Sequence, residues 1–184
     1  MTRKLTMAEL NRMSPGEFKN AEKLPVVVVL DNIRSQNNTG SVFRTADAFR
    51  LRGIFLCGIT ATPPHREIHK TALGATESVD WQYFPTTAEA IGQLRNEGYT
   101  VMAVEQAEGS VSLQDFQADE TMPLALVFGN EVNGIEDEVL RMADGIIEIP
   151  QFGTKHSINV SVSVGIVIWE VFRGMKISMA AVKP

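Results

Sequence analysis

Residues 26–44, VVVVLDNIRSQNNTGSVFR, place a buried strand, a polar loop and a helix in direct succession. Val26–Leu30 is a run of apolar, mainly β-branched residues, long enough for one strand that is buried on both faces. A helix is predicted over Thr39–Arg50, where Val42 and Phe43 fall on one side. The stretch therefore predicts the first strand and helix of an alternating β–α fold.

The same alternation continues along the chain. Residues 59–76 contain Pro63-Pro64 and Gly74 and are expected to be rich in loops. Further strands are expected at Gly53–Cys57, Val79–Phe84, Thr100–Val104, Leu124–Phe128 and Ile146–Ile149, and further helices at Thr87–Asn96 and Glu136–Met142. Because strands and helices alternate, the predicted fold class is α/β, with a mostly parallel sheet flanked by helices.

The last apolar segment, Ile158–Phe172, fits two interpretations. Up to Val164 apolar residues alternate with polar ones, which is typical of a strand. The apolar character then continues through Trp169, which is too long for an ordinary strand and favours a buried helix that starts around Ser157. The pattern alone leaves both interpretations open.

Residues 1–24 are predicted to be a helical extension that precedes the α/β domain of residues 25–184. Thr6–Glu9 and Ser14–Glu17 both match the capping box, and Pro15 suits the first position of a helix. Two short helices are therefore expected in the extension.

The composition is that of a globular protein. Of the 184 residues, 44% are hydrophobic and 21% are charged, which excludes a disordered chain. The longest apolar runs are far shorter than the ~20 residues that cross a bilayer, so no membrane association is expected. Cys57 is the single cysteine and cannot form an internal disulfide. These features together predict a soluble cytoplasmic protein.

Charge is distributed unevenly. The net charge is −5, yet residues 1–52 carry a net +4 and the remainder a net −9. Such asymmetry is typical of a protein with an anion-binding face. We expect one continuous basic face that leads to Arg44 and is built from Arg3, Lys4, Arg12, Lys19, Lys23, Arg34, Arg66 and Lys70. A purely structural role for the extension is the alternative.

Three polar segments each follow a predicted strand. They are residues 32–44, 128–134 and 149–159. In open α/β sheets, ligands bind at the carboxyl ends of the strands, so these segments are expected to form one site. Arg44 follows Gly40 by one helical turn, which lets its side chain lean over a residue without a Cβ.

Other common sites are not supported. His65 and His69 are four residues apart, but their order does not match the zinc-protease motif, and a third ligand is not evident, so no metal is expected. No P-loop lysine motif, nucleophile elbow or Gly-x-Gly-x-x-Gly occurs in the sequence. An ordinary dinucleotide-binding site is therefore disfavoured.

Together, the three segments resemble the three motifs of the SpoU (TrmH) family of ribose 2′-O-methyltransferases, in the SPOUT superfamily. Asn38-Thr-Gly40 with Arg44 resembles the first motif, Phe128–Ile135 the second, and Ile149-Pro through 157–162 the third. The resemblance covers about residues 25–173. Gln151 and Ile158 replace the Met and Leu that are frequent in the family.

The resemblance implies an α/β-knot fold, with a deep C-terminal trefoil knot at about residues 122–173, and a helix for the ambiguous last segment. S-adenosylmethionine is expected among the knot loops, in contact with Gly129, Ile149 and Ile158. Residues 104–106, at the end of the fourth strand, are expected to add to that pocket. Family members are dimers, so a homodimer is expected, with the site beside the interface.

The resemblance also implies roles for five polar residues in methyl transfer to a ribose 2′-hydroxyl. Arg44 is expected to orient the hydroxyl and a neighbouring phosphate, because a guanidinium holds its proton too tightly to be an inexpensive base. Asn38 and Asn159 are expected to position the nucleotide or Arg44. Glu131 and Ser157 are expected to hold the loops, with Glu131 a candidate partner of Arg44.

The expected substrate is RNA, either a tRNA or an rRNA, with tRNA preferred because a large appended RNA-binding domain is not evident. Two other functions stay open. One is a catalytically silent RNA-binding protein of the same fold, and the other is a knotted enzyme that methylates an RNA base.

Overall fold

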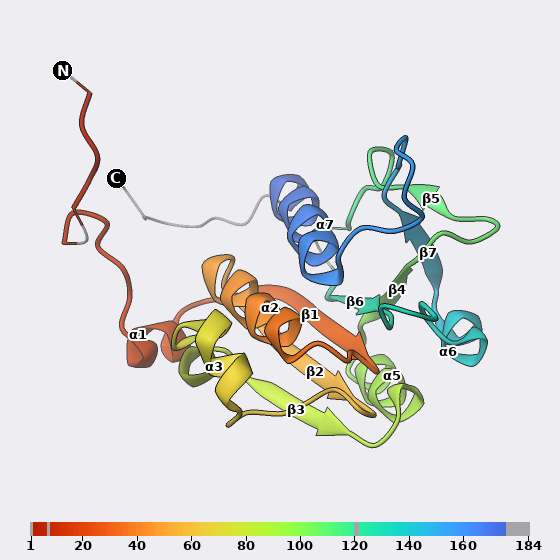
Figure 1. The fold of residues 1–184 in the computed structure, drawn as a ribbon, viewed down its shortest axis with the longest axis horizontal. Coiled ribbons are helices and arrows are strands. Elements are labelled where there is room, and N and C mark those ends of the chain that lie inside the picture. The colour runs from red at the N-terminus through yellow and green to blue at the C-terminus, as the bar shows by residue number, and fades with distance from the viewer. Residues whose placement is uncertain (1, 7, 120–121, 176–184) are drawn as a thin grey trace.

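A single parallel sheet organises the chain in the computed structural model, which describes residues 2–6, 8–119 and 122–175 (Figure 1). Within these residues the strand order is β3-β2-β1-β6-β4-β7-β5, and every pairing is parallel. The strands are β1 (Leu24–Asp31), β2 (Leu51–Cys57), β3 (Trp81–Phe84), β4 (Thr100–Val104), β5 (Val111–Ser112), β6 (Leu124–Phe128) and β7 (Gly145–Glu148). The predicted α/β class with a mostly parallel sheet is confirmed.

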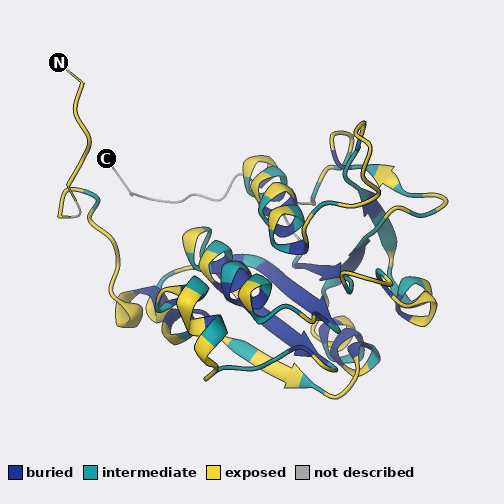
Figure 2. Cartoon of the chain, viewed as in Figure 1, coloured by how far each residue is buried: buried dark blue, intermediate teal, exposed yellow. Residues whose placement is uncertain are grey.

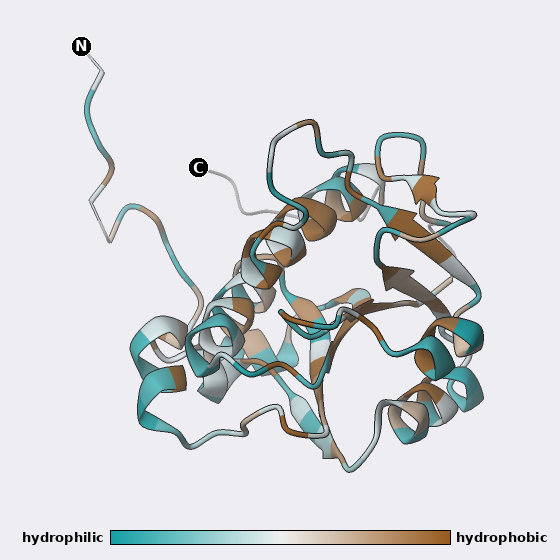
Figure 3. Cartoon of the chain, turned by 45° about the vertical axis from the view of Figure 1, so that its right-hand side comes forward, coloured by the Kyte–Doolittle hydropathy of each residue, from teal (hydrophilic) through white to brown (hydrophobic). Residues whose placement is uncertain are grey.

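Helices cover both faces of the sheet and leave the central strands β1, β2 and β6 buried between them, whereas the edge strands β3 and β5 are partly exposed (Figures 1 and 2). They are α1 (Pro15–Asn20), α2 (Gln36–Ala48), α3 (Arg66–Ala72), α4 (Ala75–Ser78), α5 (Thr87–Asn96), α6 (Asp137–Met142) and α7 (Val160–Gly174). Val26 and Val28 of β1 pack with α2, α3 and α7, whereas Val27 and Val29 pack with α5 and α6. Successive strand residues point to opposite faces, so the apolar run in β1 serves two cores. Hydrophobic residues gather on the strands and on the inner faces of the helices (Figure 3).

The last apolar segment is a helix. In α7 the buried residues are Val160, Val164, Val167, Ile168 and Val171, which follow the helical period. Val162, on which the strand interpretation depended, is exposed. The helix begins after Asn159, whose side chain accepts a hydrogen bond from the Ser161 N–H at 2.9 Å.

Residues 59–76 contain loops, as predicted, but also helices that were not predicted. They contain α3 and the start of α4. His65 caps α3, because its Nδ1 accepts the Glu67 N–H, and Leu73 ends the helix in the left-handed conformation with φ 50°. A histidine is a weaker signal for the start of a helix than the usual Ser or Asp, and a leucine at a positive φ is a weaker signal for its end than the usual Gly. The two-residue strand β5 also lay outside the prediction.

Helix α2 starts earlier than predicted. Ser35 is its N-cap and accepts the Asn38 N–H at 3.3 Å, so Asn38 lies in the first helical turn.

Gly40 has a different role from the one expected. A Cβ there would overlap Thr71 Oγ1 and the Ile68 carbonyl, so the glycine permits close packing of α2 against α3.

The N-terminal extension contains one of its two predicted helices. Ser14 and Glu17 form the capping box of α1, and Phe18 is buried in the core. Residues 8–11 form a turn rather than a second helix, although Thr6 and Glu9 make the capping contacts. One short turn without a buried anchor gains too little to propagate.

Several predictions about the wider organisation stay predictions. They are the boundary between extension and domain at residue 24 and the trefoil knot at residues 122–173. The end of the predicted domain 25–184, residues 176–184, lies outside the described residues. Within the part of the chain that is described, no helix combines the length and apolar character needed to cross a membrane.

Candidate active site

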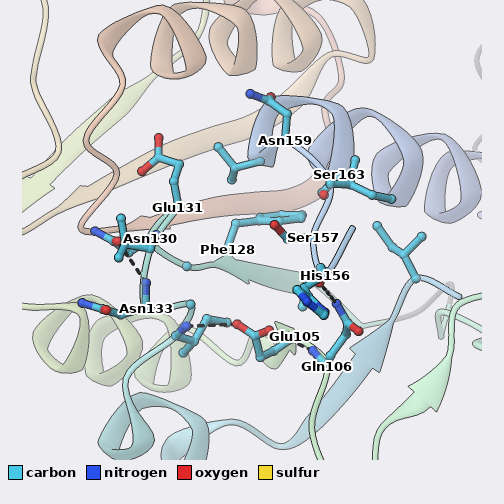
Figure 4. Close-up of a pocket in the computed structure, with 18 of the residues that line it drawn as sticks. Glu105, Gln106, Phe128, Asn130, Glu131, Asn133, His156, Ser157, Asn159 and Ser163 are labelled. Carbon is cyan, nitrogen blue, oxygen red and sulfur yellow. Dashed lines mark hydrogen bonds between the residues drawn. The ribbon is translucent and has the colours of Figure 1, made fainter. Parts of the chain in front are cut away.

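A cavity of about 620 Å³ opens where β4, β6 and β7 end (Figure 4). Three loops enclose it: the end of β4 around Glu105, residues 129–135 after β6, and residues 149–159 before α7. It sits at the carboxyl edge of a parallel sheet, where loops from neighbouring strands converge. Its lining includes Gly129, Glu131, Ile149, Ser157, Ile158 and Asn159 from the predicted site.

A chain of hydrogen bonds links the three motifs beside this cavity. Asn159 Nδ2 donates to Asn38 Oδ1 at 3.1 Å, and Asn38 Nδ2 donates to Glu131 Oε1 at 3.0 Å. The Glu131 carboxylate also accepts the backbone N–H groups of Arg34 at 3.0 Å and Ser35 at 3.1 Å. Glu131 therefore anchors the second motif to the loop and helix of the first.

These contacts set the charge state of Glu131. Burial alone raises its pKa, but the hydrogen bonds from the Arg34 and Glu131 backbones, the Asn38 side chain and the Ser35 backbone outweigh it. The pKa of Glu131 consequently lies below its ordinary value. The ionised carboxylate can only accept hydrogen bonds, which fixes Asn38 with its Nδ2 toward Glu131 and its Oδ1 toward Asn159.

Gly129 and Gly134 shape the loop after β6. Asn130 and Gly134 exchange backbone hydrogen bonds at 3.0 and 2.9 Å, and Gly134 has a φ of 68°. A Cβ on Gly129 would overlap the backbone of Gly134 and Ile135. The glycine at 129 is thus required by a close approach of the chain to itself, and it leaves its backbone on the cavity wall.

Glu105 and Gln106 brace the other side of the cavity. Glu105 Oε2 accepts the Ile135 N–H at 3.1 Å, while Gln106 Nε2 donates to the His156 carbonyl at 2.7 Å. Each residue joins the end of β4 to one of the other two loops (Figure 4). Residues 104–106 were predicted to lie near the cofactor, but no role was predicted for Glu105. The sequence feature that could have identified Glu105 is a carboxylate directly after a buried strand.

Arg44 and Asn38 lie outside the cavity lining. Asn38 is tied to it through Glu131 and Asn159, whereas Arg44 is exposed on α2. Among the described residues, no hydrogen bond or ion pair joins Arg44 to Glu131, whose oxygens are taken by Arg34, Ser35 and Asn38. In the structure the Glu131 carboxylate is therefore bonded to backbone and side-chain amide groups and not to Arg44.

The predicted basic face is partly neutralised. Arg3 pairs with Glu9 at 2.5 Å and Lys70 with Glu67 at 2.7 Å. Lys23 donates to backbone carbonyls at the end of α1, including that of Phe18. The structure brings together no group of three or more His, Cys, Asp or Glu suited to a metal ion within residues 2–6, 8–119 and 122–175.

The parallel sheet and the three-loop cavity define the chain as an α/β protein with a ligand site at the carboxyl edge of its sheet. The model of the SpoU rRNA Methylase family matches residues 25–169, so the chain belongs to this family, as its motifs predicted. A Staphylococcus haemolyticus protein named as a member of the TrmH family of tRNA/rRNA methyltransferases is 34% identical over 155 residues. That match covers 84% of this chain and 61% of the relative.

Solved structures share the fold. The AdoMet-bound rRNA methyltransferase from Sinorhizobium meliloti has a TM-score of 0.76 and 32% identity, over 88% of this chain and 61% of that one. A structure described as giving insight into the 2-OH methylation of C/U34 on tRNA has a TM-score of 0.72 and 27% identity, over 82% of this chain and 97% of that one. The chain spans about three fifths of the length of the curated relatives it matches.

Proposed function

We propose that this chain transfers the methyl group of S-adenosylmethionine to the ribose 2′-hydroxyl of a nucleotide in RNA, with tRNA as the preferred substrate. The observation that carries the proposal is the hydrogen-bonded convergence of Asn38, Glu131 and Asn159, one from each motif, beside the cavity. The structure described for 2-OH methylation of tRNA supports both the ribose and the tRNA, since it is matched over 97% of its length.

The cavity suits S-adenosylmethionine in size and chemistry. Its volume of about 620 Å³ lies within the range of small-molecule sites. Ile149 and Ile158 offer apolar surface to the adenosyl group, and Gly129 offers backbone groups. The carboxylates of Glu105 and Glu131 favour a bound cation. When bound, S-adenosylmethionine supplies an activated methyl group on a positively charged sulfur.

The polar residues then prepare the acceptor. The 2′-hydroxyl must be aligned with the methyl group and must lose its proton as the new bond forms. Arg44 orients the hydroxyl and an adjacent phosphate, and this phosphate takes the proton. Asn38 and Asn159 position the nucleotide, and Ser157 and Glu131 hold the loops around it.

Arg44 reaches the site of a second copy of the chain. Arg44 does not line the cavity of its own chain, so the proposed chemistry requires it to come from elsewhere. An exposed apolar stripe on α7 supplies the contact surface for a homodimer: Val162, Ile166 and Trp169 are 51%, 37% and 54% exposed. Their spacing puts all three on one side of the helix.

The test is transfer of a labelled methyl group from S-adenosylmethionine to purified tRNA and rRNA. Digestion to nucleosides and mass spectrometry should identify a 2′-O-methylated ribose in tRNA. Asn159→Ala should abolish transfer, because it removes the bond to Asn38 and the cap of α7. Arg141→Gln, an exposed change on α6, is the matched control and should transfer normally.

The alternatives give different products. A methylated base instead of a ribose would establish a base methyltransferase. RNA binding without transfer, with S-adenosylmethionine present, would establish a silent RNA-binding protein. Either result contradicts the proposed function.

A further inference from the structure

A second cavity lies beside α3 and α4 and, among the described residues, shares no lining residue with the candidate active site. Its volume is about 550 Å³, and it is enclosed by the segment before α3, by α3 and α4, and by the first residue of β3. The lining consists of Pro63, Pro64, His65, Arg66, Ile68, His69, Thr76, Glu77 and Trp81. It contains residues that the family motifs leave unexplained, in particular the two histidines and the Pro-Pro pair.

The apolar walls of this cavity are flat and rigid. Trp81 packs partly against the core of α2 and α3 and leaves the rest of its side chain on the cavity. Pro63 and Pro64 form another part of the wall. Aromatic side chains stack on unpaired nucleobases with little regard to sequence, because every base has a π-face.

The polar groups are donors that remain available. His65 Nδ1 accepts the Glu67 N–H at 3.3 Å, which assigns the proton of the neutral ring to Nε2 and leaves an N–H donor. His69 lies one turn further along α3 on the same side. Glu67 is engaged by Lys70 at 2.7 Å, whereas Arg66 Nε is 3.9 Å from it. The Arg66 guanidinium therefore keeps its donors for an anion.

The cavity is attached firmly to the first motif. Thr71 Oγ1 of α3 donates to the Asn37 carbonyl at 2.9 Å. Gly40 lets α3 approach α2 so closely that a Cβ would overlap the Ile68 carbonyl. Helix α3 thus holds the cavity in a fixed position beside the helix that carries Asn38 and Arg44.

We propose that this second cavity binds an unpaired nucleobase of the RNA substrate, stacked on Trp81, with its phosphate held by Arg66 and a histidine N–H. Thr76 and Glu77 also line the cavity and would supply hydrogen-bond partners for the edge of the base. The bound nucleotide is separate from the one that is methylated, so the cavity fixes how the RNA is oriented. The inference rests on the proposed function and deepens it.

The first experiment uses Trp81 as its own reporter. The chain has two tryptophans, so subtracting the emission of a Trp81→Phe variant from that of the wild type isolates the signal of Trp81 and leaves Trp169 on α7 unchanged. Adding single-stranded RNA should quench the emission of Trp81 and protect it from iodide, because a stacked base covers the ring. Anisotropy of fluorescently labelled RNA shows when binding is saturated. If the emission of Trp81 and its access to iodide are unchanged at saturation, the proposal is overturned.

The second experiment measures kinetics of the full chain. Arg66→Gln and His69→Ala should each raise the KM for RNA about tenfold with kcat and cofactor affinity unchanged, because they touch RNA away from the reacting atoms. Arg66→Gln should also flatten the slope of log K against log salt by about 0.7–0.9. Arg141→Gln removes the same charge from α6 and should change neither value.

The outcomes separate this inference from the proposed function. Normal methyl transfer with an unaltered KM in both variants would overturn the nucleobase site and leave the function standing. Conversely, quenching of Trp81 by RNA in a chain that transfers no methyl group would support the site and contradict the function.

Discussion

Asn159 Nδ2 donates a hydrogen bond to Asn38 Oδ1 at 3.1 Å and so joins residues that are 121 positions apart. Asn159 also caps α7, since its Oδ1 accepts the N–H and the hydroxyl of Ser161 at 2.9 and 2.7 Å. One side chain thereby starts the last helix and positions the first motif. The orientation of α7 and the geometry of the site are consequently coupled.

Glu131→Gln should weaken this coupling. The neutral side chain accepts fewer and weaker hydrogen bonds from Arg34, Ser35 and Asn38. Because Glu131 is exposed on one side, solvent screens it, and we expect the free energy of unfolding at pH 7 to fall by about 1 kcal/mol. Denaturant unfolding of both proteins measures the difference.

The stability difference between wild type and Glu131→Gln should depend on pH. The folded-state pKa of Glu131 is lowered, so its stabilising contribution is fully present above the ordinary pKa and is lost as the pH falls through the folded pKa. The difference between wild type and Glu131→Gln should therefore be constant down to about pH 5 and shrink below it. Glu108→Gln, at an exposed loop position, is the control; a difference that grew with acid would contradict the argument.

Gly40→Ala should destabilise the fold, whereas Gly92→Ala should not. At Gly40 a Cβ would overlap Thr71 and the Ile68 backbone, so α2 and α3 must separate at a cost of about 1–3 kcal/mol. At Gly92, inside α5, no atom lies within 4 Å of the added Cβ, and alanine should stabilise the helix by about 0.5–1 kcal/mol. Thermal unfolding of the two variants measures the difference in stability. Equal midpoint temperatures would contradict the prediction.

The sequence predicted the fold to within a few residues where the hydrophobic pattern was strong. Thr100–Val104 and Leu124–Phe128 match β4 and β6 residue for residue. It failed at α3, where the start and stop signals are His65 and Leu73 rather than common capping residues. For short helices the local signal decides the prediction, and an unusual cap hides it.

Within the site, the motifs identified which residues converge but not what each contacts. Gly129 was expected to contact the cofactor, and the structure adds that its missing Cβ leaves space for the backbone of residues 134 and 135. The hydrogen bonds of Glu131 to backbone amides of the first motif connect residues almost a hundred positions apart. Backbone partners of this kind leave no trace in side-chain identity, so sequence alone could not reveal them.

Gly129→Ala should abolish binding of S-adenosylmethionine by displacing the loop after β6. The added Cβ would lie 2.6 Å from the Gly134 carbonyl oxygen, so the paired backbone of Asn130 and Gly134 must open. Gly153→Ala lies in the loop 149–159 with no atom within 4 Å of its Cβ and should bind normally. Calorimetry on both variants tests the contrast, and equal affinities would show that the loop tolerates the change.

The last prediction is that Arg44 acts on the site of a second copy. Arg44 follows Asn38 by six positions, which places the two side chains ~120° apart around α2 and ~9 Å along it. Asn38 is hydrogen-bonded to Glu131 beside the cavity of its own chain, so Arg44 points in a different direction and does not line that cavity. A heterodimer of Arg44→Ala and Gly129→Ala chains should therefore recover about half of the wild-type activity.

This recovery arises because one cavity in the heterodimer keeps Gly129 and receives an intact Arg44 from the other chain. Each homodimeric variant should be inactive, since it lacks either the orienting guanidinium or the cofactor loop. Arg44→Lys should fail to replace the arginine in the same mixture, because a point charge cannot make a forked contact with hydroxyl and phosphate. If Arg44 served its own cavity, no active combination would exist in the heterodimer, so an inactive mixture of purified, tagged chains would overturn the assignment.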